Sequence, residues 1–181
     1  MKKTNILVLS YAHQGGEWIA TTRLLKAIKN RLGKKISLTT ASFTDGYEEK
    51  FPIFERQIFI PHAKTQKPFS FFKKLINDFK NSRKAILEIE SDLMNIDFIL
   101  VTHYLFLPQI LSWRFLRRKR AFYYFQGLKS GIIANLDFRQ LVIKLFEMLS
   151  MTFSSVIIVP SKSAGDFISS LLGPFSKFKP Y

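Results

Sequence analysis

Short apolar runs alternate with amphipathic segments along almost the whole chain. The apolar runs predict strands at 5–10, 35–40, 56–61, 97–102, 121–125 and 155–159. Apolar residues at steps of three and four predict helices at 15–32, 70–93, 108–120, 138–149 and 161–172. Strands with two apolar faces that alternate with helices are typical of a parallel sheet covered by helices on both sides. We therefore expect a single α/β domain over residues 1–181, with no internal repeat or linker.

The composition indicates which partners the chain can bind and which kinds of site it can form. With 181 residues and 47% hydrophobic residues, the chain is long enough for one globular domain or for half of a larger protein. Its 28 Lys and Arg against 13 Asp and Glu give a formal net charge of +15, which favours phosphorylated ligands, nucleic acid or an anionic membrane. Cysteine is absent, and His13, His62 and His103 are the only histidines, so we expect no disulfide and no metal site.

The N-terminal sequence and the most apolar stretches indicate a cytoplasmic protein. The apolar run at 5–10 is shorter than a signal-peptide core and has no cleavage site after it. The stretches 93–111 and 141–160 are interrupted by charged residues or proline, whereas a membrane-spanning helix needs about 20 nearly uninterrupted apolar residues.

Ligands of such sheets bind at the carboxyl ends of the strands, so the residues that follow each strand are the candidates for chemistry. Gly15, Gly16 and Glu17 follow the first strand, where glycines let a ligand approach the backbone and a helix N-terminus offers free N–H groups to an anion. His103 follows the strand at 97–102, and the turn 126–127 follows the strand at 121–125. For each there is a simpler interpretation, namely a chain turn for the glycines and a structural hydrogen bond for the histidine.

The other candidates are weaker. Ser161 follows the last strand as a plausible helix N-cap, a position that can also face a ligand. The chain has neither a Gly-x-Gly-x-x-Gly nor a Walker A loop, and it lacks a nucleophile elbow, so the usual dinucleotide, nucleoside-triphosphate and hydrolase interpretations have no motif.

Basic residues gather in two places, and two interpretations of them stay open. They are either an ordinary solvated face or, together with the Phe residues at 69–72, a surface that rests on anionic lipid. Nucleic acid fits the charge as well, but no nucleic-acid recognition pattern is present, so we expect no nucleic-acid partner. The candidate membrane-facing residues are Lys73, Lys74, Arg117, Arg118, Lys119 and Arg120.

The order of these motifs resembles a known family. The run 5–10 with Gly15-Gly16-Glu17, then 97–103, 122–127 and 156–161, is similar to the N-terminal domain of GT-B glycosyltransferases of family 4, over essentially the whole chain. The resemblance implies a Rossmann-like domain, one half of a GT-B fold, that holds the acceptor and faces a second domain that holds most of a nucleotide-sugar donor. It also implies retention of anomeric configuration, no metal, and a glycan or lipid-linked acceptor.

The resemblance also assigns roles to residues of this chain. It places Gly15 and Gly16 near the donor diphosphate with Glu17 nearby, and it implies that His103 and the turn Gln126-Gly127 line the cleft. His103 and Gln126 are then the expected catalytic residues, and the expected binding residues are Gly15, Gly16, Glu17, Gly127 and Ser161. Gln126 departs from the pattern, because many members have a histidine there.

A larger departure concerns the second domain. Residues 1–181 contain no paired glutamates of a donor-binding domain, so we expect half of an enzyme that needs a donor-binding domain in cis or as a subunit and is inactive alone. One alternative is a non-catalytic α/β module that docks on an anionic membrane, at its inner face, or on a protein partner. Another is a Rossmann-like nucleotide-binding enzyme of a different kind, which lacks its phosphate motif.

Overall fold

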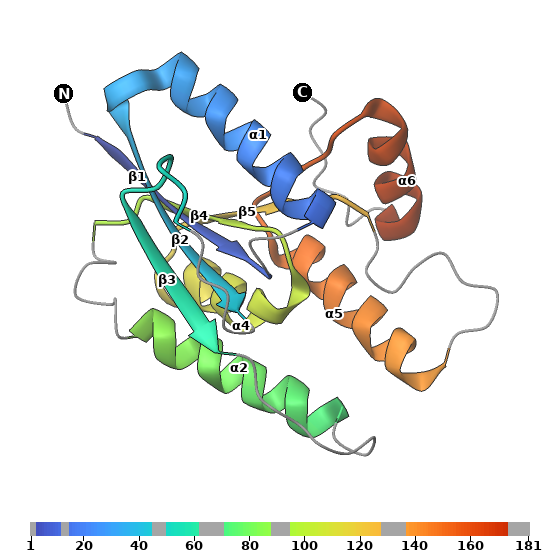
Figure 1. Ribbon diagram of the computed structural model, residues 1–181. Coiled ribbons are helices and arrows are strands. Elements are labelled where there is room, and N and C mark those ends of the chain that lie inside the picture. The colour runs from blue at the N-terminus through green and yellow to red at the C-terminus, as the bar shows by residue number, and fades with distance from the viewer. Residues whose placement is uncertain are drawn as a thin grey trace.

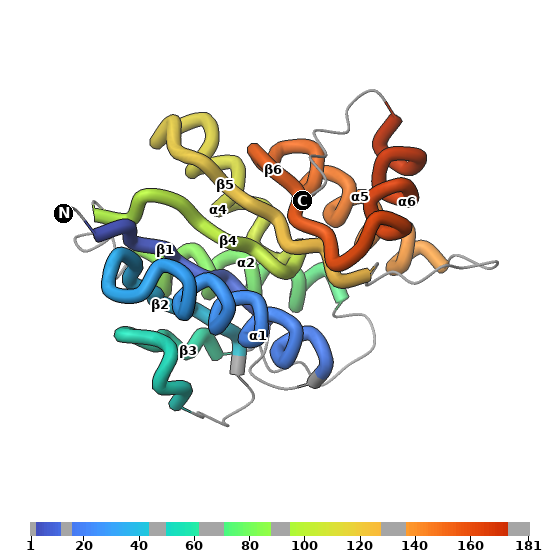
Figure 2. Tube along the Cα trace, turned by 90° about the horizontal axis from the view of Figure 1, so that it is seen from above, coloured from blue at the N-terminus to red at the C-terminus, as the bar shows by residue number. Residues whose placement is uncertain are grey.

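The fold is a six-stranded, entirely parallel sheet in the order β3-β2-β1-β4-β5-β6. It was obtained as a computed structural model, which describes residues 3–11, 15–44, 50–61, 71–87, 95–127 and 137–173. Figure 2 shows the strands side by side in this order, with α1 in front of β1 and β2. The strands are β1 (Thr4–Ser10), β2 (Ile36–Thr44), β3 (Arg56–Pro61), β4 (Phe98–Val101), β5 (Arg120–Tyr124) and β6 (Val156–Ile158). The predicted parallel α/β sheet is therefore confirmed, and every predicted strand is present with its ends shifted by at most four residues.

Helices cover both faces of the sheet (Figure 1). Helix α1 lies on one face, and α2, α4 and α5 lie on the other. The α-helices are α1 (Gly15–Leu32), α2 (Phe71–Leu87), α4 (Leu107–Leu111), α5 (Phe138–Phe153) and α6 (Lys162–Leu172), with short turns η1 (Gly33–Lys35), η3 (Tyr104–Phe106) and η4 (Ser112–Leu116). The part of the predicted helix 70–93 that falls at 70 and 88–93 lies outside the described residues.

Successive side chains of each strand are buried on alternate faces of the sheet, which explains why the strands appear in the sequence as continuous apolar runs. Leu7 and Leu9 of β1 belong to the core cluster under α2, α4 and α5, whereas Ile6 and Val8 belong to the cluster under α1. Because successive side chains of a strand point to opposite faces, both faces must be apolar when helices cover both. The sheet therefore has a core on each side.

One predicted helix starts where expected, with Pro108 in its first turn, but its C-terminal part is wrong. Instead of a single helix at 108–120, the chain after β4 forms η3, then α4, then the π-helical turn η4, and it leaves the helix at Leu116. Arg118 has a φ of 52°, a left-handed conformation that does not continue a helix, and Arg120 already belongs to β5. Arg117, Arg118 and Lys119 thus connect η4 to β5, and Arg120 begins β5, so the basic run is not a helix end.

Helix α5 is present where its periodicity predicts it, but it presents an unexpected face to the solvent. Phe138, Leu141 and Leu145 are exposed, whereas Glu147 and Met151 are buried. Asp137 caps the helix start, accepting from the backbone N–H of residue 140 at 2.8 Å. An apolar stripe therefore remains at the surface near the start of α5.

Candidate functional site

The order in which the chain adds strands to the sheet reverses between β1 and β4. The carboxyl ends of these two strands form the centre of the candidate site. Chain order runs outward from β1 to β3 and then returns to the other side of β1 as β4, which makes this edge the topological switch point. The backbone N–H of Thr102 donates to the carbonyl of Leu9 at 2.9 Å and so extends the pairing beyond β4. Ser10, at the end of β1, is buried, and its hydroxyl has no hydrogen-bond partner among the described residues. This buried hydroxyl lies beside the switch point.

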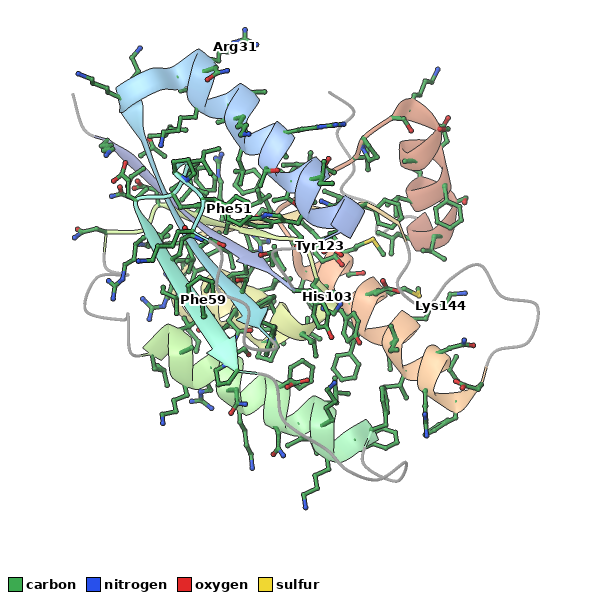
Figure 3. All side chains as sticks on the ribbon, in the orientation of Figure 1. Arg31, Phe51, Phe59, His103, Tyr123 and Lys144 are labelled. Atoms are coloured by element: carbon green, nitrogen blue, oxygen red, sulfur yellow. The ribbon has the colours of Figure 1, made fainter. Side chains whose placement is uncertain are left out.

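His103 lies at this edge, where its sequence position predicts it (Figure 3). Its side chain is only 5% exposed and stacks on Tyr11 with ring centroids 4.4 Å apart. Nδ1 accepts a hydrogen bond from the backbone N–H of Leu105 at 3.3 Å. Since Nδ1 is the acceptor, the proton of the neutral imidazole belongs on Nε2. His103 is therefore held in the tautomer that donates through Nε2.

Gln126 joins the end of β5 to the first turns of α1. Its Nε2 donates to the hydroxyl of Thr21 at 2.7 Å, and that hydroxyl donates to the carbonyl of Glu17 at 2.8 Å. A threonine hydroxyl has one hydrogen, so towards Gln126 it acts only as an acceptor, and the orientation of the amide is fixed. The amide oxygen Oε1 of Gln126 is buried without a partner among the described residues. It is an acceptor for a hydrogen-bond donor that the described part of the chain does not supply.

The structure requires glycine at only one of two glycine positions at this edge. Gly16 lies in the first turn of α1 and is exposed, and a Cβ added there would meet nothing within 4 Å. Gly127 has a φ of 133°, a conformation that residues with a side chain rarely adopt. Packing therefore does not require glycine at position 16, whereas the turn after β5 does require it at position 127.

Two further predicted binding residues have clear positions. Glu17 is half-buried in the first turn of α1, where its backbone carbonyl holds Thr21. Ser161 is exposed and caps α6, accepting from the backbone N–H of Ala164 at 3.2 Å. The N-cap interpretation of Ser161 is confirmed, and a role for it towards a ligand stays a prediction.

A pocket of about 310 Å³ opens beside His103. Tyr11 and His103 form one side, and Lys74 and Asp78 of α2 form another. The remaining lining residues are Phe71, Leu75, Tyr104, Leu105 and Ile143. Its volume is at the small end of the range of ligand pockets, about 300–1,000 Å³. The pocket therefore offers one cation, one carboxylate and one imidazole to a small polar group.

Tyr11 and Asp78 line this pocket, but neither was predicted as a site residue from the sequence. Asp78 is only 3% exposed and occupies the buried stripe of α2 together with Leu75 and Ser82. A carboxylate on the apolar stripe of an amphipathic helix is unusual, because burial of a charge is unfavourable unless it is compensated. That position marks Asp78 in the sequence, and Tyr11 directly follows the predicted strand 5–10, which also marks its position.

Two buried tyrosines stay protonated near this site. Burial raises the pKa of Tyr104 and of Tyr123, and the carboxyl group of Glu147 raises both further. Neither phenol therefore ionises near neutral pH, so each is available only as a neutral hydroxyl.

The basic residues that the sequence groups together point to different environments. Lys73 is exposed, while Lys74 lines the pocket beside His103. Arg117 stacks over Trp113 at 5.0 Å, and Lys119 donates to the carbonyl of Ile96. Arg118 and Arg120 are exposed. Contact of these residues with a membrane stays a prediction.

The described residues contain neither a membrane-spanning helix nor a cluster of metal ligands. None of their helices combines the length and the apolar character of a membrane span. No three His, Asp or Glu side chains among them lie close enough to hold a metal ion. His13 and His62 lie outside the described residues, and the expected absence of a metal stays a prediction.

Solved structures, but no sequence families, are similar to this chain. No protein-family model and no curated protein matches the sequence. UGT2 of Phytolacca americana, complexed with UDP-2-fluoroglucose and pterostilbene, matches 98% of this chain and 54% of its own at 9% identity, with a TM-score of 0.67. Sucrose-phosphate synthase of Thermosynechococcus elongatus matches 98% and 47% at 14% identity, with a TM-score of 0.64. A putative UDP-N-acetylglucosamine 2-epimerase of Listeria monocytogenes matches 94% and 43% at 12% identity, with a TM-score of 0.61.

The chain thus has the fold of one Rossmann-like half of the GT-B architecture. It spans about half the length of the solved structures that it matches.

Proposed function

We propose that this chain is the acceptor-side half of a retaining glycosyltransferase similar to those of family 4, which transfers a sugar from a nucleotide-diphosphate donor to a glycan or lipid-linked acceptor. The observation that supports it most directly is the oriented amide of Gln126, whose buried oxygen has no donor among the described residues. A sugar hydroxyl is a donor of the kind that such an oxygen accepts. Solved structures with the same fold include one complexed with a UDP-sugar analogue.

In this proposal the residues at the carboxyl edge have separate roles. Gln126 accepts from a hydroxyl of the transferred sugar and fixes the orientation of the ring. His103, protonated on Nε2, donates to an oxygen of the sugar, and its stack on Tyr11 holds the imidazole in place. The N-terminal turn of α1, with Gly15 and Gly16, lies near the donor diphosphate, where free N–H groups favour an anion.

The pocket beside His103 is the proposed acceptor site. It adjoins the imidazole, so an acceptor hydroxyl bound there lies next to the sugar. The hydroxyls of the acceptor have both a donor in Lys74 and an acceptor in Asp78 within the same pocket. A donor-binding domain, in cis or as a subunit, supplies the remaining contacts to the nucleotide, and the chain alone is inactive.

The proposal is tested on the natural protein that contains this chain, with a panel of radiolabelled nucleotide-sugars and glycan acceptors. We expect nucleotide-sugar-dependent transfer. We also expect Gln126→Ala and His103→Ala each to lower kcat by about 10- to 100-fold, because misplaced reacting groups have effects of this size. Asn30 is exposed on α1, the helix whose Thr21 binds Gln126, and Asn30→Ala should leave transfer unchanged. Full transfer by both site variants, or transfer without any nucleotide-sugar, would overturn the proposal.

A further inference from the structure

A second and larger pocket lies at the opposite edge of the sheet. It has a volume of about 640 Å³ and lies between the end of α2 and the segment α4–η4. Because η4 ends just before β5 begins, this pocket lies at the amino edge. Lys119, which follows η4, donates to the carbonyl of Ile96 just before β4, in agreement with this position. The proposed sugar site lies at the carboxyl edge. The two pockets are therefore separate.

The lining of this pocket, which we call the amino-edge pocket, is mostly apolar. Two arginines accompany the apolar side chains, Arg83 from α2 and Arg117 just after η4. The complete lining is Arg83, Ile86, Leu87, Pro108, Gln109, Leu111, Ser112, Trp113, Phe115, Leu116 and Arg117. Apolar walls favour a hydrocarbon chain, and guanidinium groups favour a phosphate or carboxylate. The pocket thus fits an amphiphile with one anionic end.

Two buried polar atoms of the pocket residues lack partners. Ser82 donates its one hydroxyl hydrogen to the carbonyl of Phe79 at 2.9 Å, so it accepts from Nε2 of Gln109 at 3.0 Å. This orientation leaves Oε1 of Gln109 without a partner, and Nε1 of Trp113 also has none among the described residues. Both atoms are covered in the structure, so an ester or hydroxyl group of a ligand would satisfy them only if this wall rearranges.

The rim of the amino-edge pocket carries Leu116, the most exposed large apolar side chain among the described residues. Leu116 is 82% exposed and Phe115 is 61% exposed, and Leu87 completes the rim. Exposed apolar side chains beside basic ones are typical of protein surfaces that rest on anionic lipid. A second copy of the chain is a poorer occupant, because the net charge of +15 opposes its approach.

We propose that the amino-edge pocket binds an acyl chain of an anionic membrane lipid. The chain of the lipid lies between α2 and α4, and its phosphate lies on Arg83 and Arg117. Phe115 and Leu116 enter the interfacial layer of the membrane. This assignment does not depend on the proposed sugar transfer, because it uses neither His103 nor Gln126.

The two tryptophans of the chain allow a direct test. Trp113 lines the amino-edge pocket, whereas Trp18 is buried in the other core under α1. Vesicles of phosphatidylglycerol with brominated acyl chains quench a tryptophan only at contact. In Trp18→Phe we expect these vesicles to quench the emission of Trp113, and brominated phosphatidylcholine to leave it unchanged. In Trp113→Phe the emission of Trp18 should stay unchanged with either vesicle.

A matched pair of charge variants separates a specific site from general attraction. Arg83→Gln and Arg31→Gln remove the same charge, but Arg31 lies near the end of α1, on the other side of the sheet (Figure 3). Since one basic residue at a membrane surface contributes about 1 kcal/mol, Arg83→Gln should weaken vesicle binding about fivefold. Arg31→Gln should change it less than about twofold.

Three results would overturn the proposal. The first is equal weakening by the two arginine variants, which would show adhesion by net charge alone. The second is quenching of Trp18 as strongly as of Trp113. The third is concentration-dependent dimerisation that Leu116→Asp abolishes, which would assign the rim to a second copy of the chain. Circular dichroism of each variant checks that it is folded.

Discussion

Removing the Thr21 hydroxyl is the sharpest test of the candidate site, because that one group connects β5 to α1. Thr21→Val keeps the shape and the β-branch of the side chain but removes the acceptor of Gln126 and the donor to Glu17. Thr21 is completely buried, so water cannot replace the hydroxyl without rearrangement. The amide of Gln126 then loses the contact that fixes its orientation.

The expected loss follows from these contacts. A buried polar group that loses its partner costs about 1–3 kcal/mol, so the free energy of unfolding should fall by about that amount. For a chain of 181 residues each kcal/mol corresponds to about 2–4 °C, so Tm should fall by about 2–12 °C. Thermal unfolding followed by circular dichroism measures this change. Transfer by the natural protein should fall with it, because Gln126 is free to rotate.

The next residue supplies the matched control. Thr22→Val removes a hydroxyl that donates to the carbonyl of Ile19 at 3.0 Å within the same helix. Both variants lose a hydroxyl-to-carbonyl bond through the same Thr→Val change, but Thr21 is fully buried and Thr22 only partly so. A double-mutant cycle is therefore needed to isolate the bond to Gln126. A double-mutant cycle of Thr21→Val with Gln126→Ala should give a coupling of about 0.5–3 kcal/mol. Equal effects of the two valine variants, together with additive behaviour in the cycle, would refute the role of this bond.

Three other predictions concern stability, and denaturant unfolding checks each. Asp137→Ala should lower the free energy of unfolding by about 0.5–2 kcal/mol, because it removes the cap that accepts from Gln140 at 2.8 Å. Gly127→Ala should lower it by about 1–3 kcal/mol, since a side chain strains a backbone with a φ of 133°. The hydrogen bond from Lys3 is the largest cause that lowers the pKa of Glu55 in the folded protein. Its contribution is present above the unfolded pKa and is lost as pH falls through the lowered one, so Glu55→Gln should remove less than about 1 kcal/mol at pH 7 and nothing at low pH.

The strands could be predicted from the sequence because each is buried on both faces. Leu7 and Leu9 pack under one layer of helices and Ile6 and Val8 under the other, so the run is apolar without a gap. The order of the strands could not be predicted in this way, because it depends on pairing between segments that are far apart in sequence. The turn η4 was hidden as well, since an apolar stretch with a π-helical turn does not keep the spacing of an α-helix.

The position of the candidate site could be predicted, but its contacts could not. His103 and Gln126 lie at strand ends, and strand ends are visible in the sequence. The partner of Gln126 is Thr21, 105 residues away, and no local pattern joins the two. Asp78 was predictable in principle, since its carboxylate interrupts the buried stripe of α2.

The two proposed sites constrain the acceptor if they act together. The amino-edge pocket and the sugar site are separated by the length of the strands, and seven residues of β1 at about 3.3 Å each span roughly 23 Å. With the amino edge on the membrane, His103 stands about that far above the lipid headgroups. A sugar attached directly to a lipid headgroup cannot reach this height while the lipid stays in the bilayer. Lipid docking at the amino edge therefore favours a soluble glycan, or a long glycan on a lipid anchor, over a lipid that carries a single sugar.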